Sequence, residues 1–194
     1  AIDSVSILKS EFASRNDLTI FYRQDDKIVT TKINETAKQP ILWQENSQLT
    51  GDSITIYLDD NNIKQLDVDG TSFMLSQNEY NLERYDQTSS SQIKIFFTDS
   101  KITRAEFYGN VYSIYFMYDG ETANGLTKSN SAETMVLFED SEVTEVKLYR
   151  NPASEYYPEK QVNGNEKSYL LPRFVVLQNK PTKEEMYKLL NELR

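Results

Sequence analysis

Apolar and polar residues alternate in short stretches of this chain, and the stretches recur. Every second residue is apolar in residues 53–58 and again in residues 92–97. A period of two is typical of a β-strand with one buried face and one wet face. Each stretch is followed by a short polar segment and a second alternating stretch, so the pattern predicts β-hairpins.

The hairpin pattern occurs three times in the middle of the chain. The copies cover residues 52–70, 91–109 and 132–150, at offsets of 39 and 41 residues. Their predicted tips are rich in Asp, Asn and Ser, which favour tight turns: Asp59 to Asn62, Asp99 to Lys101, and Asp140 to Glu142. A weaker copy covers residues 18–33, with Asp25 and Asp26 at its turn.

Two details recur within the copies. Ile63, Ile102 and Val143 each lie three residues before the next apolar position, which is one residue too many for strict alternation. We therefore expect a β-bulge after each turn. Gly70 and Gly109 end the first two copies, where we expect sharp bends. Arg150 stands at that place in the third copy, which predicts a terminal variant of the repeat.

The segments around the repeats are less regular. We expect a Ser-rich loop over residues 87–92 and a strand with two apolar faces over residues 111–118. Residues 151–167 are polar and predict irregular structure, and residues 169–177 predict an apolar strand. At the C-terminus, Thr182 and Glu185 have the spacing of a capping box before an amphipathic helix with Met186, Leu189, Leu190 and Leu193 on one face.

Hairpins with one apolar face cannot bury that face alone, so repeated copies are expected to stack. The predicted fold is all-β, with repeated hairpins stacked into an elongated jelly roll or β-taco-like solenoid and a short C-terminal helix. We expect residues 1–150 to form the hairpin domain and residues 151–194 to pack on it. The open strand edges at the two ends need a cap or a partner.

Composition excludes several kinds of chemistry. The 194 residues include no histidine and no cysteine, which excludes histidine-based triads, thiolate nucleophiles, cysteine-ligated metals and disulfides. The net charge is −9 without a basic cluster, which argues against nucleic acid as a partner. No run of about 18 apolar residues predicts a membrane span. The first residue is Ala1 in place of an initiator methionine, and we expect a processed or truncated chain whose targeting segment lies outside the printed sequence.

Three features admit a functional and an ordinary reading. Tyr108, Tyr112, Tyr115, Tyr118, Tyr156 and Tyr157 are compatible with sugar stacking, but tyrosine is also a common strand residue. Residues 59–62 offer oxygen ligands for Ca²⁺ but lack the glycine and distal glutamate of an EF-hand loop. A glycosidase-like carboxylate pair is formally available, but the acids fall at turns and outward positions. We expect no catalytic residue, no cofactor and no metal.

The sequence resembles a known family in its central and late segments. Residues 49–52, the repeated strand, Asp turn and strand unit ending in Gly70 and Gly109, and residues 157–158, 170–174 and 180–184 look like OstA-like proteins. These proteins belong to the lipopolysaccharide-transport and organic-solvent-tolerance superfamily, here in the form found in Bacteroidetes. The resemblance covers about residues 45–185, and the third copy departs from it at Arg150, as do residues 175–177.

The resemblance implies a non-enzymatic periplasmic protein of outer-membrane biogenesis that shelters the acyl chains of lipopolysaccharide, or of another lipid, in an apolar β-groove. It also implies end-to-end pairing of edge strands with other β-jelly-roll envelope proteins. The alternative is a secreted or surface carbohydrate-binding or structural β-module.

The candidate lipid-groove residues are the inward positions of the hairpins, which could equally form a closed core: Ile54, Ile56, Leu58, Leu66, Val68, Ile93, Ile95, Phe97, Phe107, Met135, Leu137 and Leu148. Ala105 and Val146 are predicted to face inward as well. Phosphates of a lipid need cations at the rim of such a groove, and the candidates are Lys94, Lys101 and Arg104.

Overall fold

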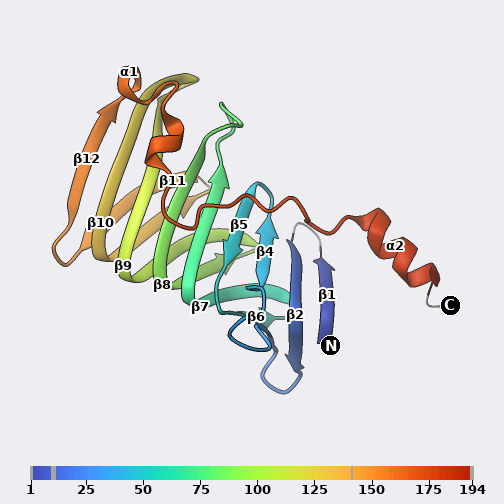
Figure 1. The fold of residues 1–194 in the computed structure, drawn as a ribbon. Helices are drawn as coiled ribbons and strands as arrows, with labels where there is room; N and C mark the ends of the chain where they lie inside the picture. Colours follow the sequence, from blue (N-terminus) through green and yellow to red (C-terminus); the bar gives the residue numbers. More distant parts are fainter. Residues whose placement is uncertain (1, 10–11, 141, 193–194) are drawn as a thin grey trace.

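The computed structural model describes residues 2–9, 12–140 and 142–192. Within these ranges the chain forms one antiparallel sheet of twelve strands followed by short helices, so the predicted all-β fold class is confirmed (Figure 1). The elements are β1 (Ile2–Lys9), β2 (Phe12–Tyr22), β3 (Lys27–Thr31), β4 (Ile41–Gln44), β5 (Ser47–Thr50), β6 (Ser53–Asp59), β7 (Asn62–Gln77), β8 (Tyr85–Thr98), β9 (Lys101–Asp119), β10 (Thr122–Glu139), β11 (Glu142–Tyr149), β12 (Ala153–Pro158), α1 (Glu159–Val162), η1 (Glu166–Tyr169) and α2 (Lys183–Glu192).

The long strands β7 to β10 bend in the middle, so that the sheet folds into two facing walls (Figure 1). One wall contains the tips of the repeated hairpins and consists of β3, β6, β11 and the adjoining halves of β7 to β10; we call it the hairpin wall. The other contains β4, β5, β12 and the other halves of β7 to β10. We call it the strap wall, because the C-terminal segment crosses its outer face (Figure 1).

The walls are joined at the N-terminal end by β2. Its first half pairs with β4 of the strap wall, and its second half pairs with β3 of the hairpin wall. At the other end β10 pairs with β11 in one wall and with β12 in the other, and no strand among the described residues joins these two edges. One strand thus spans both walls near the N-terminal end, whereas the walls finish in two separate strands at the C-terminal end; we call these the closed end and the open end.

The predicted bulges are confirmed in all three copies. The pairing register shifts by one residue just after each tip, at Lys64, Thr103 and Thr144. The hydroxyl groups of Thr103 and Thr144 donate to the carbonyl oxygens of Phe96 and Leu137, each over 3.2 Å. These bonds satisfy carbonyl groups next to the bulge, where the regular ladder is interrupted.

The predicted bends are also confirmed, and they are the corners between the walls. Gly70 and Gly109 have φ angles of +90° and +76°, and a Cβ there would lie 2.2 Å from Asp52 Oδ2 and 2.7 Å from Ser91 Oγ, respectively. Arg150 adopts the same left-handed region with a φ of 61° and ends the copy that forms the open edge. Its guanidinium pairs with Glu133 over 3.0 Å.

The core between the walls is packed at the N-terminal end. Phe12, Leu42, Leu49 and Met74 of the strap wall side contact the aliphatic inner face of the hairpin wall. Beyond β7, Val111 is the one strap-wall residue in this cluster among the described residues. Packing between the walls therefore fades toward the open end.

The C-terminal segment differs from the sequence prediction. β12 is a strand where irregular structure was expected, and it lies beyond the boundary predicted at residue 150 but in the same sheet. No strand forms over residues 169–177, so that prediction is wrong. Residues 87–92, expected as a loop, belong to β8.

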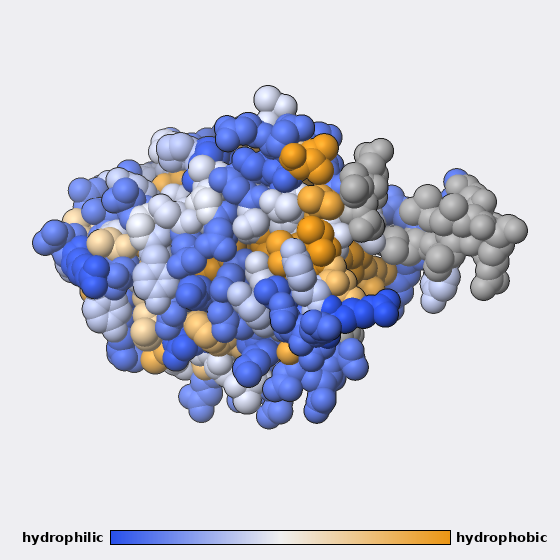
Figure 2. Space-filling model, turned by 90° about the horizontal axis from the view of Figure 1, so that it is seen from below, coloured by the Kyte–Doolittle hydropathy of each residue, from blue (hydrophilic) through white to orange (hydrophobic). Residues whose placement is uncertain are grey.

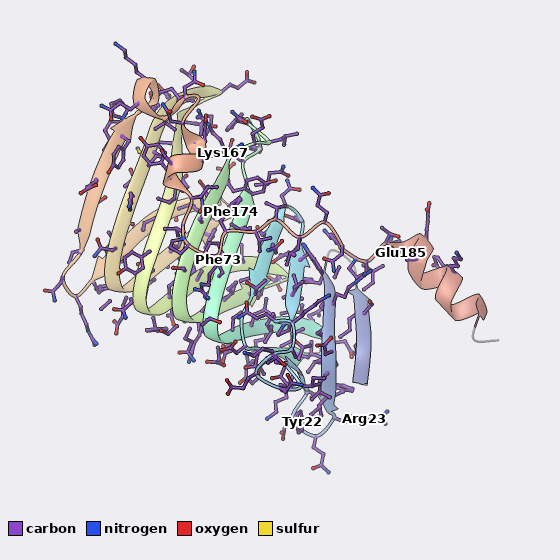
Figure 3. The ribbon with its side chains drawn as sticks, viewed as in Figure 1. Tyr22, Arg23, Phe73, Lys167, Phe174 and Glu185 are labelled. Carbon is purple, nitrogen blue, oxygen red and sulfur yellow. The ribbon has the colours of Figure 1, made fainter. Side chains whose placement is uncertain are left out.

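Residues 159–182, which we call the strap, bury a second apolar cluster on the outer face of the strap wall. Val162 and Leu171 of the strap pack with Phe73, Ile114 and Phe116. Figure 3 shows Phe174 of the strap beside Phe73 of β7, and both belong to this cluster. The strap therefore covers the part of the outer face of the strap wall that carries this cluster.

Two glutamines attach the main chain of the strap in place of a neighbouring strand. Gln87 Oε1 accepts the Leu171 N–H over 2.8 Å. Gln48 donates to the Val175 carbonyl over 3.0 Å and accepts the Leu177 N–H over 2.9 Å. Because side chains satisfy these backbone groups, the strap stays extended without joining the sheet.

The start of the predicted C-terminal helix is confirmed by its cap. The Thr182 N–H donates to Glu185 Oε2 over 3.0 Å, and the Glu185 N–H donates to Thr182 Oγ1 over 3.2 Å. This is the reciprocal capping box that the spacing predicted. The residues predicted to form the apolar face of the helix, Met186, Leu189, Leu190 and Leu193, lie outside the described side chains.

Candidate functional site

The inward residues of the first two hairpins form a closed core. They are at most 7% exposed: Ile54, Ile56, Leu66, Val68, Ile93, Ile95, Phe97, Ala105 and Phe107. Leu58 is partly buried against them. In this part of the chain, side chains from both walls fill the interior.

The prediction for the first strand of the third hairpin is wrong by one position, whereas Val146 and Leu148 of its second strand face inward as predicted. Met135 and Leu137 pair with Glu106 and Arg104, whose neighbours in the strand face inward. The inward residues of β10 are therefore Thr134, Val136 and Phe138. All four residues from Met135 to Phe138 are apolar, so alternation alone could not choose the face.

A small apolar cavity of about 50 Å³ lies at the N-terminal end of the interior. Its lining includes Phe12, Leu42, Leu58 and Ile63. A space of this size holds about one or two water molecules and is too small for an acyl chain. The inward residues at the N-terminal end are therefore packed as a core around this small cavity.

The inner face becomes exposed at the C-terminal end. On β11 of the hairpin wall, Val143 and Val146 are 42% and 53% exposed, and Val146 pairs with the inward residue Val136. On the strap wall, Tyr115 and Met117 are 47% and 37% exposed on the face that carries Met74 near the closed end. Large apolar side chains of both walls thus face the open end of the jelly roll.

Leu148 is the predicted groove residue that lies in this region. It pairs with Thr134 on the inner face of the hairpin wall and is partly buried. Tyr115, Met117 and Tyr156 were not among the predicted groove residues. They lie in strands of the strap wall, outside the repeated hairpins whose alternation guided the prediction.

The predicted phosphate contacts do not lie on the inner face. Lys94 and Arg104 belong to the outer face of the hairpin wall, where Lys94 lies opposite Asp67 and Glu106. Arg104 pairs with Glu106 over 2.9 Å and lies 4.1 Å from the ring of Phe96. Lys101 is at a hairpin tip and pairs with Asp140 over 2.7 Å. Lys94 and Arg104 are therefore directed away from the interior, and Lys101 lies at the tip of the second hairpin.

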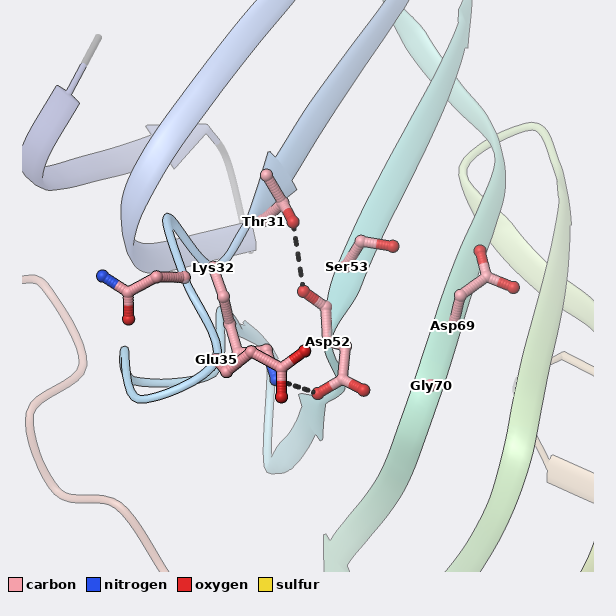
Figure 4. A pocket seen from close by; sticks show the side chains of 8 residues that line it. Thr31, Lys32, Glu35, Asp52, Ser53, Asp69 and Gly70 are labelled. Atoms are coloured by element: carbon pink, nitrogen blue, oxygen red, sulfur yellow. Dashed lines mark hydrogen bonds and ion pairs between the residues drawn. The ribbon is translucent and has the colours of Figure 1, made fainter.

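A polar pocket of about 350 Å³ lies outside the first corner, between Lys32, Glu35, Asp52 and Asp69 (Figure 4). Lys32 Nζ lies 2.7 Å from Asp52 Oδ1, and this contact lowers the pKa of Asp52 to about 2. Asp52 Oδ2 also accepts the Thr71 N–H over 3.3 Å, next to Gly70. The Asp52 carboxylate thus holds the bend of β7, which is a structural role.

Asp86 is a carboxyl group on the inner face of the strap wall. It lies opposite Ser76, and its Oδ1 accepts the Phe116 N–H over 2.8 Å. Burial raises the pKa of Asp86 to about 7, against the opposing effect of that hydrogen bond. Burial also raises the pKa of the neighbouring Tyr115, with a further contribution from Asp86.

The tyrosines do not form one platform. Tyr115 and Tyr156 face the interior of the strap wall, whereas Tyr112, Tyr118 and Tyr157 lie on its outer face. Tyr108 lies on the outer face of the hairpin wall and donates to Glu106 over 2.7 Å. Within the described residues no group of three acidic side chains is placed to hold a metal ion.

A comparison with solved structures returns a protein of the same architecture. LptH from Pseudomonas aeruginosa, the periplasmic component of the lipopolysaccharide transport device that is homologous to LptA, matches with a TM-score of 0.53. The match covers 86% of this chain and 94% of that chain, at 14% sequence identity. The chain has the fold of LptH. Searches against known protein families and against curated proteins found no match.

The likeness to LptH confirms the predicted fold class, an all-β jelly roll of stacked hairpins. Among the described residues, no helix combines the length and the hydrophobicity needed to cross a bilayer.

Proposed function

We propose that this protein is a non-enzymatic, lipid-handling module of the cell envelope, of the kind that moves lipopolysaccharide through the periplasm. The observation that carries the proposal is the exposed apolar inner face at the open end, formed by Val143, Val146, Tyr115 and Met117. This face occurs in a fold shared with a lipopolysaccharide transport component, and the sequence pattern resembles the same superfamily.

The physical basis of binding is burial of hydrocarbon. Each methylene group removed from water contributes about 0.8 kcal/mol, before the loss of chain freedom is subtracted. Acyl chains would therefore contact Val146, Leu148 and Val136 on the hairpin wall and reach toward the closed core. In this proposal the protein forms no covalent bond with the lipid and needs no reactive side chain.

We also propose that modules join end to end through their edge strands. β11 offers one unpaired edge, and at the other end of the hairpin wall the last residues of β2, Ile20 to Tyr22, pair only with β3 among the described strands. Ile20 and Phe21 of that edge are 39% and 51% exposed. Seen from below, apolar residues gather toward the end that carries α2, while most of that surface is hydrophilic (Figure 2). Unpaired strand edges of this kind favour pairing with another chain.

Photocrosslinking tests lipid binding at the open end. A benzophenone amino acid replaces Val146, which faces inward, or its neighbour Lys147, which faces outward on the same strand. We expect a lipopolysaccharide adduct from position 146 and none from position 147. Equal labelling at both positions, or no adduct from position 146, would contradict the proposal.

Sedimentation velocity tests end-to-end assembly. If edge strands pair, the average mass rises as the protein concentration is increased from micromolar to millimolar. A monomer over that whole range would contradict the assembly but not the binding of lipid.

A further inference from the structure

The two inner faces at the open end differ in chemistry. The hairpin wall presents Val136, Phe138, Val146 and Leu148, with Thr134 as the polar residue among them. The facing strands of the strap wall carry mostly hydroxyl or carboxyl groups on their inner side. One wall is therefore suited to hydrocarbon, whereas the other is rich in hydrogen-bonding groups.

The polar groups of the strap wall form a continuous strip across adjacent strands. Thr88 Oγ1 donates to Ser113 Oγ over 3.3 Å, between β8 and β9. Asp86 and Tyr115 follow on the same strands, and Thr127 of β10 pairs with Tyr115. Thr88, Ser113, Asp86 and Thr127 are partly buried, and Tyr115 is more exposed, at 47%. Their hydroxyl groups can donate to and accept from a bound molecule.

The charge on this strip favours a neutral ligand group. Between β7 and β12, the described inner face of the strap wall holds no lysine or arginine, and Lys128 lies on the outer face with Leu126. A phosphate would find no cation there and would meet the Asp86 carboxyl. A hydroxyl or amide group needs no cation and can bond to hydroxyl and carboxyl groups alike.

From this asymmetry, and on the basis of the proposed function, we infer that the strap wall selects lipids with a neutral polar group in their acyl region. Thr88, Ser113 and Tyr115 bind that hydroxyl or amide group, while the hairpin wall contacts the hydrocarbon. The lipid therefore lies between the walls in a defined orientation, with its phosphates outside this face.

Matched fatty acids test the inference. Tetradecanoic acid, 3-hydroxytetradecanoic acid and 12-hydroxytetradecanoic acid carry the same charge, and their affinities are measured by displacement of a fluorescent fatty acid. We expect at least one hydroxy acid to bind about two- to tenfold more tightly than tetradecanoic acid, as one hydrogen bond provides.

Two variants locate the effect. In the double variant Thr88→Val with Tyr115→Phe, which removes two hydroxyl groups from the strip, the ratio of the affinity for the hydroxy acid to the affinity for tetradecanoic acid should fall to about one. Tyr112→Phe is the matched control, because Tyr112 is 48% exposed on the outer face of the same strand. This control should keep the preference.

The outcomes separate the inference from the proposed function. If all three acids bind the parent protein with equal affinity, the inference is wrong and lipid binding stands. If the preference survives in the double variant, the strap wall does not cause it and the inference is again wrong. If no acid binds, the proposed function itself is contradicted, and the inference with it.

Discussion

The ion pairs of Arg84 are expected to hold the strap on the sheet. The Arg84 side chain is 2% exposed, and its guanidinium contacts Glu159 through two hydrogen bonds of 3.0 and 2.6 Å and Glu166 through one of 2.9 Å. It also lies 5.1 Å from the ring of Phe116, beneath the strap. Replacing both glutamates with glutamine leaves a buried guanidinium without a counter-charge.

Removing the partners of a buried charge costs about 3–5 kcal/mol of unfolding free energy. The side chains of Glu159 and Glu166 are 27% and 26% exposed, so water can reach the site and the lower value, about 3 kcal/mol, is expected. With a urea dependence of about 2–3 kcal/mol per molar, the unfolding midpoint falls by about 1 M.

Urea unfolding followed by tryptophan fluorescence and circular dichroism measures this change. Trp43 is the single tryptophan and packs with Leu177 of the strap, so its emission reports the attachment of the strap. The control pair is Lys101 and Asp140, with side chains 62% and 81% exposed, where Asp140→Asn should leave the unfolding midpoint nearly unchanged because solvent screens the pair. A loss for the double glutamine variant no larger than that of the control would refute the reasoning.

Three other predictions concern single groups. The folded-state pKa of Asp52 is lowered to about 2, so the stabilising effect of its carboxylate is present above about pH 4 and is lost as the pH falls toward 2. Asp52→Asn should remove this acid dependence of the unfolding free energy. At pH 7 the substitution should cost about 1 kcal/mol, because the side chain is 38% exposed and solvent screens the ion pair. The folded-state pKa of Asp86 is raised to about 7, so its contribution to the unfolding free energy is fully present below about pH 4 and is lost as the pH rises through 7. At pH 8, Asp86→Asn should therefore unfold at a higher denaturant concentration than the parent protein. A lower midpoint would contradict the assignment. In Gly125→Ala the new Cβ would lie 2.1 Å from the Tyr157 carbonyl oxygen, so thermal unfolding should show that the unfolding free energy falls by more than about 2 kcal/mol. Gly120→Ala is the control, because open space surrounds Gly120, and it should lose about 1 kcal/mol. Equal losses would show that β12 is not held as described.

The local features of the hairpins could be predicted because they depend on neighbouring residues. The period of two, the turn residues and the extra residue after each turn fixed three hairpins with bulges at Lys64, Thr103 and Thr144. Gly70 and Gly109 marked the corners because a left-handed backbone favours glycine. These are short-range signals.

The strap wall was harder to predict because its apolar side chains lie on the outer face, under the strap, whereas those of the hairpin wall lie on the inner face. Residues 87–92 resemble a loop in sequence, but they form a strand whose outer face is covered by the strap and whose inner face is polar. The bond from Leu171 to Gln87 joins residues 84 positions apart, and no periodic pattern signals it. The exposed inner face at Tyr115 depends on this arrangement and was missed for the same reason.

The central claim is that lipid acyl chains bind the inner face at the open end. In a Trp43→Phe background, a single tryptophan is placed at Tyr115, on the inner face, or at Tyr112, on the outer face, where exposure is 47% and 48%. Lipopolysaccharide with brominated acyl chains should quench the emission from position 115 and leave that from position 112 unchanged. Quenching at position 112 alone, or equal quenching at both positions, would contradict the account.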